Sequence, residues 1–282
     1  MPKEKMIYVT KASGEKAEFN PEKIRKTCLK AGATKKLADE VTKEITKKAY
    51  SGIKTKKILQ MTIRLLEKKM PHVAAKYDLK GAIMRLGPAG FAFENLVAEI
   101  LSEYGHKTFP HSILEGGCVE HEVDIIAEKK ERCAMIECKY HNLPGIYTGI
   151  KDALYTYARF LDLQEGAKMG RCRNFTDAWL ICNTKFSTDA IRYAACKHMR
   201  LIGWSWPRGA GSLQKMLDAK KMYPITILRK LDKDSQKKLS KARMMLCKDL
   251  LAMDIDDLRK LTGISKRKLI ELRKEAQNII KK

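Results

Sequence analysis

The sequence predicts a multidomain α/β protein with three segments, and three patterns in the chain support this fold class. Two short alternating stretches followed by helical patterns open the chain, the centre alternates between strand and helix patterns, and the C-terminal end is helical throughout and very basic. A turn-forming run at 87–90 and a turn-rich run at 207–212 separate these patterns. We therefore expect the segments 1–87, 88–222 and 223–282.

The composition indicates a partner that is a polyanion. Lys and Arg number 57 against 33 Asp and Glu, which gives a net charge of +24 and a pI near 9.7. Such a surface attracts DNA or RNA, although a lysine-rich solvated surface is the simpler alternative. The eight cysteines form no CxxC pair, which argues against a zinc ribbon. No apolar stretch approaches the length of a membrane span and no signal peptide is evident, so we expect a cytoplasmic protein with no membrane partner.

The N-terminal segment predicts a β-hairpin followed by a helical cluster. Residues 7–10 and 16–19 alternate around a turn at Ser13-Gly14. Pro21 is suited to the first turn of a helix, with Asn20 as its cap. Apolar residues one helical turn apart then predict small amphipathic helices up to about residue 86.

The central segment predicts an α/β layer in the order helix, three strands, helix, strand, helix, strand. Its first helix presents an apolar face from Phe93 to Leu101 and ends at Gly105. The later elements are expected as strands at 106–114, 118–127 and 132–140, a helix at 147–162, a strand at 177–183, a helix capped by Ser187 and a strand at 200–204.

The second and third of these strands form a hairpin that brings two carboxylates and an ammonium group together. If the loop is 128–131, Asp124 lies opposite Met135, and the strand period of two puts Glu137 and Lys139 on the same face as Asp124. Clustered carboxylates repel one another, and a hard divalent cation relieves that repulsion. A metal-activated water with Lys139 beside it suits phosphodiester cleavage. A surface hairpin with ordinary charged residues is the alternative.

Asp124 followed thirteen residues later by Glu137-Cys138-Lys139 resembles the metal site of the PD-(D/E)XK nucleases. Flanking residues 90–106 and 181–204 are most similar to the Mrr-type restriction endonucleases and the archaeal Holliday-junction resolvases. The resemblance implies a restriction-endonuclease-like core, with Glu94 joining the site. It implies Mg²⁺ or Mn²⁺ held by Asp124, Glu137 and Glu94, catalysis by these residues and Lys139, and a homodimer or higher homo-oligomer.

In the N-terminal segment, residues 9–14 and 19–24 resemble the ATP-cone, the nucleotide-sensing domain of ribonucleotide reductases. The resemblance implies that ATP or dATP binds in a strand-turn-helix cradle. The contacts it implies are Val9, Lys11, Lys23 and Thr55. Ala12 stands where the family usually has a basic residue, and loss of nucleotide binding is the alternative.

In the C-terminal segment, residues 258–269 resemble a helix-hairpin-helix. Such a turn directs backbone N–H groups at a DNA phosphate without reading sequence. The DNA contacts it implies are Gly263, Ser265, Lys266, Arg267 and Lys268. An ordinary helix pair with a basic face is the alternative.

Together these features predict a metal-dependent DNA endonuclease regulated by ATP or dATP. One alternative is a catalytically silent, ATP-sensing protein that binds DNA. Another is a resolvase of branched DNA, which would act as a symmetric dimer.

Overall fold

The computed structural model describes residues 6–87 and 90–281, which form two compact units. Residues up to Ala82 combine with the residues from Tyr223 onward, and Ile83–Met222 form the second unit. The predicted mixed α/β composition with a helical C-terminal region is confirmed. No helix in the described ranges has the length and apolarity needed to cross a membrane.

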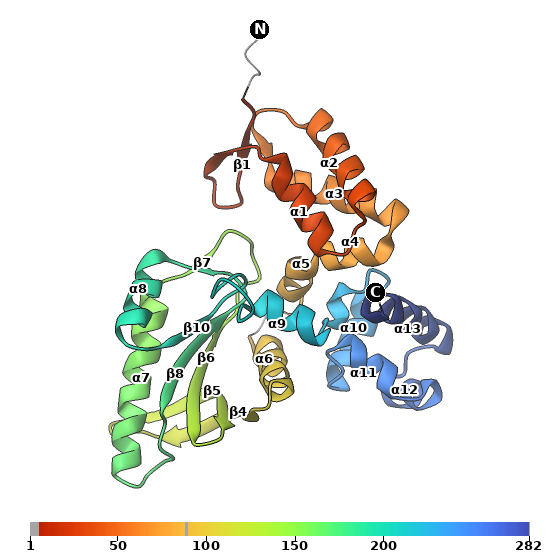
Figure 1. Cartoon of the computed structure of the whole chain (residues 1–282). Coiled ribbons are helices and arrows are strands. Elements are labelled where there is room, and N and C mark those ends of the chain that lie inside the picture. Colours follow the sequence, from red (N-terminus) through yellow and green to blue (C-terminus); the bar gives the residue numbers. More distant parts are fainter. Residues whose placement is uncertain (1–5, 88–89, 282) are drawn as a thin grey trace. The chain divides into compact units, whose positions relative to one another are not determined.

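The N-terminal part of the first unit is a small sheet with helices packed on it (Figure 1). Its elements are β1 (Tyr8–Thr10), β2 (Lys16–Glu18), α1 (Pro21–Lys30), α2 (Lys35–Lys48), β3 (Ile53–Lys54), α3 (Thr55–Lys69), α4 (Pro71–Tyr77) and α5 (Leu79–Met84). The sheet order is β2-β1-β3, in which Val9 pairs with Ala17 of antiparallel β2 and with Ile53 of parallel β3. Pro21 does begin α1 after Asn20, but the Asn20 side chain makes no capping hydrogen bond.

The C-terminal part of the first unit is helical. Its elements are η1 (Ile225–Ile227), α10 (Lys233–Lys241), α11 (Cys247–Ala252), α12 (Ile255–Thr262) and α13 (Lys266–Lys281). The Thr226 hydroxyl donates to the Ala82 carbonyl over 2.7 Å, and Arg229 forms an ion pair with Glu67. The first and third predicted segments therefore pack into one unit, an association that short-range patterns in the sequence do not reveal.

The second unit is built on a five-stranded sheet. Its elements are α6 (Phe91–Glu103), β4 (Lys107–Glu115), β5 (Glu120–Lys129), β6 (Arg132–Lys139), β7 (Tyr147–Thr148), α7 (Ile150–Lys168), β8 (Asp177–Cys182), β9 (Lys185–Phe186), α8 (Thr188–Cys196), β10 (Arg200–Ile202) and α9 (Leu213–Lys220). The strand order is β10-β8-β6-β5-β4, with β4, β5 and β6 antiparallel and β6, β8 and β10 parallel. Helices α7 and α8 lie on one side of this sheet and α6 on the other (Figure 1).

Two helix predictions in this unit meet different outcomes. The Ser187 side chain accepts the Ala190 N–H, so the predicted cap of α8 is confirmed. The helix expected at 147–162 instead spans Ile150–Lys168, because Tyr147 and Thr148 pair with β9 as a short strand.

The β5–β6 hairpin is tighter than the sequence predicted. Lys129 pairs with Arg132, so Lys130 and Glu131 form the loop, and Ile126 rather than Asp124 lies opposite Met135. Lys130 takes a left-handed conformation with φ 54°, which a two-residue hairpin loop favours. The predicted register was wrong by two residues. Because the side-chain period is also two, the prediction of which residues share a face survives.

The two faces of the sheet have different coverings. Ile126, Met135 and Leu180 belong to a buried cluster that includes Phe160 and Leu163 of α7. Neighbouring strand residues alternate to the other face, on which α6 lies. This division places Glu137, two residues from Met135, on the α7 side.

Candidate active site

Asp124 and Glu137 come from neighbouring strands of the hairpin. The last paired residues are Ile125 and Ile136, and one further step in this register sets Asp124 against Glu137. The Cys138 N–H donates to Asp124 Oδ2 over 2.7 Å. The Asp124 side chain thus bridges the two strands where their ladder ends, so the sheet fixes the position of its carboxylate.

Glu137 meets a buried arginine of α7. The Arg159 guanidinium binds the Glu137 carboxylate through Nη1 and the Glu122 carbonyl through Nη2. Arg159 was not identified from the sequence. Ala153, Thr156 and Phe160 are buried on the same helix, and a charged residue on that buried stripe is the signal that could have pointed to it.

Glu94 meets a histidine that was also missed. His111 Nδ1 lies 3.2 Å from Glu94 Oε2, and the imidazole stacks on Phe91 with ring centroids 4.2 Å apart. His111 has φ 54° and lies between Pro110, which pairs with Ile125, and Ser112. A positive φ in the middle of a strand cannot be anticipated from the alternating pattern of the sequence.

Lys139 follows Glu137 at the end of β6, and its Nζ lies 3.2 Å from Asp152 Oδ1. The other Asp152 oxygen accepts the Gly149 N–H over 2.9 Å, at the start of α7. A helix terminus therefore holds the carboxylate that orients Lys139. His141, close in sequence, is anchored by Asn183 and lies 3.0 Å from the Thr148 hydroxyl.

Burial raises the pKa values of the acidic residues, and neighbouring carboxylates add to the shift. Burial, followed by the charges of Asp124 and Glu122, raises the pKa of Glu94 to about 7. Burial and Asp124 raise the pKa of Glu137 to about 7, although Arg159 and Lys139 oppose the shift. Burial also raises the pKa of Asp124, while the Cys138 N–H and Arg159 act against it. The site therefore holds partly uncompensated negative charge, which a cation would relieve.

Each predicted metal ligand already has a protein partner. In the described ranges, only Cys118, Asp162 and Glu165 form a group of three ligand-type side chains whose atoms all lie within 4.8 Å. That group lies where the turn between β4 and β5 meets α7, and there Asp162 accepts the Cys118 N–H over 2.8 Å and pairs with His121. The Asp162 carboxylate therefore stabilises the turn between β4 and β5. The ligand atoms of Glu94, Asp124 and Glu137 do not all lie within 4.8 Å of one another.

Two of the predicted nucleotide contacts, Lys11 and Thr55, lie at one end of the small sheet. Helix α1, which carries Lys23, begins at the other end, where the Phe19 N–H donates to the Ile7 carbonyl. The register pairs Thr10 with Lys54, so Lys11 and Thr55 follow on adjacent strands, and Thr55 begins α3. Lys23 lies in the first turn of α1 and Val9 is buried in β1. Lys11 forms an exposed ion pair with Glu15. The end of the sheet that carries Lys11 therefore offers a phosphate group this lysine and the N-terminus of α3.

The predicted DNA-binding turn lies between α12 and α13. Gly263 takes φ 65° and ends α12, and the Ser265 hydroxyl accepts the Lys268 N–H over 3.3 Å. Lys266 pairs with Asp256, and Lys268 pairs with Asp232 over 2.9 Å. The Arg267 side chain is 92% exposed, and its Nε lies 4.0 Å from Glu271 Oε1.

Comparison with known proteins identifies both ends of the chain. Residues 7–79 match the ATP cone domain, and residues 223–280 match the description "AF1548-like, C-terminal". An uncharacterized protein of Archaeoglobus fulgidus is 42% identical over 184 residues, which are 65% of this chain and 99% of that protein. The chain belongs to the AF1548-like family.

Two further likenesses agree with this assignment. The crystal structure of AF1548, described as a protein of unknown function, is 41% identical with a TM-score of 0.59, covering 68% of this chain and 99% of that one. A second uncharacterized protein of A. fulgidus is 46% identical over 46 residues, which are 16% of this chain and 96% of that protein. The 184 residues shared with the first A. fulgidus protein extend well beyond the 223–280 match, so the AF1548-like likeness is not confined to the C-terminal helices. The N-terminal ATP cone gives this chain a nucleotide-binding domain.

Proposed function

We propose that the protein is a metal-dependent DNA endonuclease whose activity is regulated by ATP or dATP bound to the cone. The observation that carries this proposal is the grouping of Glu94, Asp124 and Glu137, whose pKa values are raised first by burial and then by neighbouring carboxylates, near the ammonium group of Lys139. Carboxylates whose pKa values are raised by their neighbours are typical of functional sites. The helix, three-strand, helix, strand order of α6 to β8 supports the resemblance to the restriction-endonuclease-like core.

The donor set suits a hard cation, since Asp124, Glu137 and Glu94 offer only carboxylate oxygens. Mg²⁺ or Mn²⁺ held there would activate a water molecule and stabilise charge on the phosphate. The Cys138 N–H keeps one Asp124 oxygen fixed, and release of Glu137 by Arg159 would free the second ligand. Lys139, oriented by Asp152, would donate to the developing negative charge.

The basic surface and the C-terminal turn supply the affinity for DNA in this proposal. The net charge of +24 attracts the phosphate backbone whatever the sequence. Arg267 is the cation at the turn that is most accessible to a phosphate.

One observation favours a second candidate, a catalytically silent protein that senses ATP and binds DNA. Arg159 forms an ion pair with the Glu137 carboxylate, and the Arg159 side chain is only 8% exposed. A permanent ion pair there would take the place of the metal. The two functions differ in one measurable respect, which is whether DNA is cut.

The experiment incubates supercoiled, linear and branched DNA with the full-length protein and Mg²⁺ or Mn²⁺, with and without ATP. We expect cleavage that EDTA abolishes and that is lost in Glu137→Gln and in Lys139→Ala. Glu131→Gln, at the exposed hairpin loop, is the matched control. If wild type and Glu137→Gln degrade DNA equally, or if neither does so while both bind it, the endonuclease proposal is refuted. Preferential cutting of branched DNA would identify a resolvase.

A further inference from the structure

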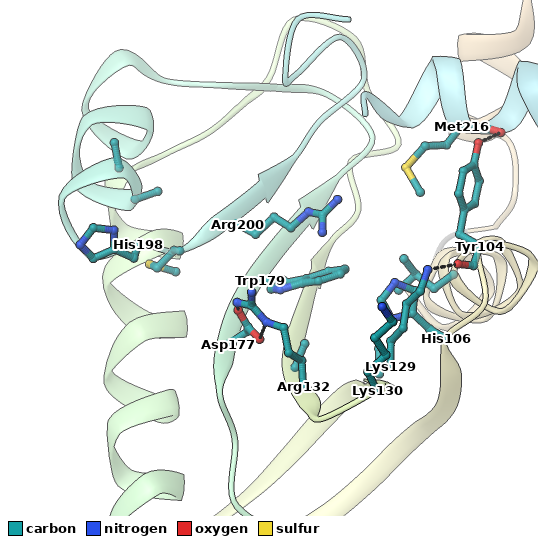
Figure 2. A pocket seen from close by; sticks show the side chains of 16 residues that line it. Tyr104, His106, Lys129, Lys130, Arg132, Asp177, Trp179, His198, Arg200 and Met216 are labelled. Atoms are coloured by element: carbon teal, nitrogen blue, oxygen red, sulfur yellow. Dashed lines mark hydrogen bonds and ion pairs between the residues drawn. The ribbon is translucent and has the colours of Figure 1, made fainter. Parts of the chain in front are cut away.

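A cavity in the second unit lies on the face of the five-stranded sheet from which Trp179 projects (Figure 2). Its volume is about 770 Å³, and Trp179 forms part of its wall. Trp179 pairs with Ile136 across the sheet, whereas Glu137 pairs with Leu180, so the indole and the Glu137 carboxylate project to opposite faces. The cavity is therefore separate from the acidic site.

The walls of the cavity combine apolar surface with positive charge. Leu101, Ala134 and Met216 contribute apolar surface. The cations are Lys129, Lys130, Arg132 and Arg200, and the single acid is Asp177. The Arg132 guanidinium is engaged by Asp177, with Nε donating to Oδ2 over 2.8 Å. Among the described residues, neither Lys130 nor Arg200 forms an ion pair, and Asp177, which Arg132 already engages, is the acid whose charge acts on Arg200. Positive charge therefore remains for an anionic ligand.

Planar groups line the middle of the cavity. The guanidinium of Arg200 lies 4.3 Å from the Trp179 ring centroid, and His106 meets the same ring edge-on at 5.5 Å. In Figure 2, Arg200 and Trp179 lie one above the other, facing the side of the cavity that carries His106 and Lys129. A guanidinium on an indole offers the kind of surface on which nucleobases stack.

His106 also has a polar atom that lacks a partner. Its Nδ1 is buried and finds no hydrogen bond within the described ranges. Burial, Lys129 and Arg200 lower the pKa of His106, which reflects the positive potential in this cavity. Buried polar atoms are normally satisfied, so a ligand atom is a natural partner for this nitrogen.

We propose that this cavity binds a phosphorylated nucleoside, either as a free nucleotide or as the phosphorylated end of a DNA strand. The apolar wall and Trp179 receive the base and sugar, and Lys130 with Arg200 receive the phosphate. The volume lies within the range of about 300 to 1,000 Å³ that is usual for small-molecule sites. This binding does not depend on the proposed DNA cleavage.

Tryptophan fluorescence provides a readout confined to the second unit. The tryptophans are Trp179, Trp204 and Trp206, and the cone contains none, so nucleotide bound to the cone leaves no direct signal. The full-length protein is titrated in EDTA with dAMP, with a short single-stranded DNA bearing a 5′-phosphate, and with deoxyadenosine. We expect quenching by the two phosphorylated ligands and an affinity for deoxyadenosine that is about tenfold weaker or worse.

Charge-reversal variants test the two cations that are proposed to bind the phosphate, Lys130 and Arg200. Lys130→Glu and Lys130→Glu/Arg200→Glu are each expected to weaken dAMP binding about tenfold or more. Lys168→Glu, an exposed lysine outside the cavity, should leave it unchanged. Tighter binding of the oligonucleotide would identify a strand end as the ligand, and tighter binding of dAMP a free nucleotide. The proposal is overturned if no phosphorylated ligand quenches, if deoxyadenosine binds as well as dAMP, or if folded Lys130→Glu protein binds like wild type.

Discussion

The Arg159 guanidinium binds the Glu137 carboxylate from a buried position on α7, and the same side chain bonds the Glu122 carbonyl. One arginine therefore ties the helix to both strands of the hairpin. The pKa of Glu137 is nevertheless raised to about 7, because burial and Asp124 outweigh the opposing effect of Arg159. This balance makes the ion pair sensitive to pH and to any cation that competes for Glu137.

Replacing Arg159 by Met tests that balance. Glu137 would keep its burial and lose its compensating charge, so its folded pKa would rise further above the ordinary value of 4.5. A raised carboxyl pKa contributes stability at low pH that is lost as the pH rises through the folded pKa. We expect Arg159→Met to lower the free energy of unfolding by about 3 kcal/mol at pH 8 and by less at pH 5, measured by urea denaturation.

The control for this prediction is the double variant Arg159→Met/Glu137→Gln, which removes both charges. It should recover part of the stability lost at pH 8. An equal loss at both pH values, with no recovery in the double variant, would mean that Arg159 acts by packing alone.

Glu94 gives a second prediction about pH. Its pKa is raised to about 7 by burial and by Asp124 and Glu122, so its ionisation opposes folding. The stability that Glu94 contributes is present below about pH 4.5 and is lost as the pH rises through about 7. In EDTA, Glu94→Gln should therefore be more stable relative to wild type at pH 8 than at pH 5.5, by an amount on the order of 1 kcal/mol.

Thermal unfolding at the two pH values measures the effect, with the exposed Glu131→Gln as the matched control. A Tm difference between Glu94→Gln and wild type that does not change with pH would show that Glu94 ionises normally in the folded protein.

The sequence predicted the acidic face of the hairpin for a physical reason. The strand period of two fixes which residues share a face, and the two-residue error in register left Asp124 and Glu137 together. Their partners were beyond prediction, because Arg159 and His111 reach the site through tertiary packing and through a left-handed residue inside β4. Local periodicity carries no information about the left-handed conformation of His111. For Arg159 it indicates only a charged residue on the buried stripe of α7, without identifying Glu137 as its partner.

The same limit applies to domain organisation. The turn-rich run at 207–212 and the helical end of the chain were evident in the sequence, and that end matches the AF1548-like C-terminal description. Its packing onto the N-terminal part depends on contacts such as Thr226 with Ala82, which are far apart in sequence. The cone was recognisable because its strand, turn and helix are contiguous.

Asp152 connects Lys139 to the start of α7, which leads to a third prediction. Asp152→Ala removes the acceptor of the Gly149 N–H and the partner of Lys139. We expect a loss of about 1 kcal/mol in unfolding free energy from the missing cap and a fall in cleavage that is smaller than in Lys139→Ala. Asp189→Ala, an exposed acid in the first turn of α8, is the control. Unchanged stability would exclude the capping role.

At the C-terminal turn, the neighbouring basic residues Arg267 and Lys268 have different environments. Arg267 is exposed, whereas Lys268 pairs with Asp232 and donates to the Lys230 carbonyl. Arg267→Ala should weaken DNA binding and reduce the slope of log affinity against log salt by about 1. Lys268→Ala should instead lower stability more than DNA affinity. Fluorescence anisotropy with labelled duplex DNA measures both, and Lys237→Ala on α10 is the control. If the slope of log affinity against log salt is the same in Arg267→Ala and wild type, this turn does not contact DNA.

The cone provides a prediction that rests on strand register. Lys11 and Thr55 follow the paired residues Thr10 and Lys54, so they come off adjacent strands at the point where α3 begins. A triphosphate bound there would meet Lys11 and the N-terminus of α3. The resemblance to the ATP cone adds Lys23, on α1, as a further contact. We expect Lys11→Ala and Lys23→Ala each to weaken ATP and dATP binding about tenfold in isothermal titration calorimetry. Lys26→Ala, an exposed lysine further along α1, should bind as wild type does. Loss of binding in all three variants alike would point to a diffuse effect of positive charge. Wild-type affinity in Lys11→Ala and Lys23→Ala would place the nucleotide elsewhere on the cone.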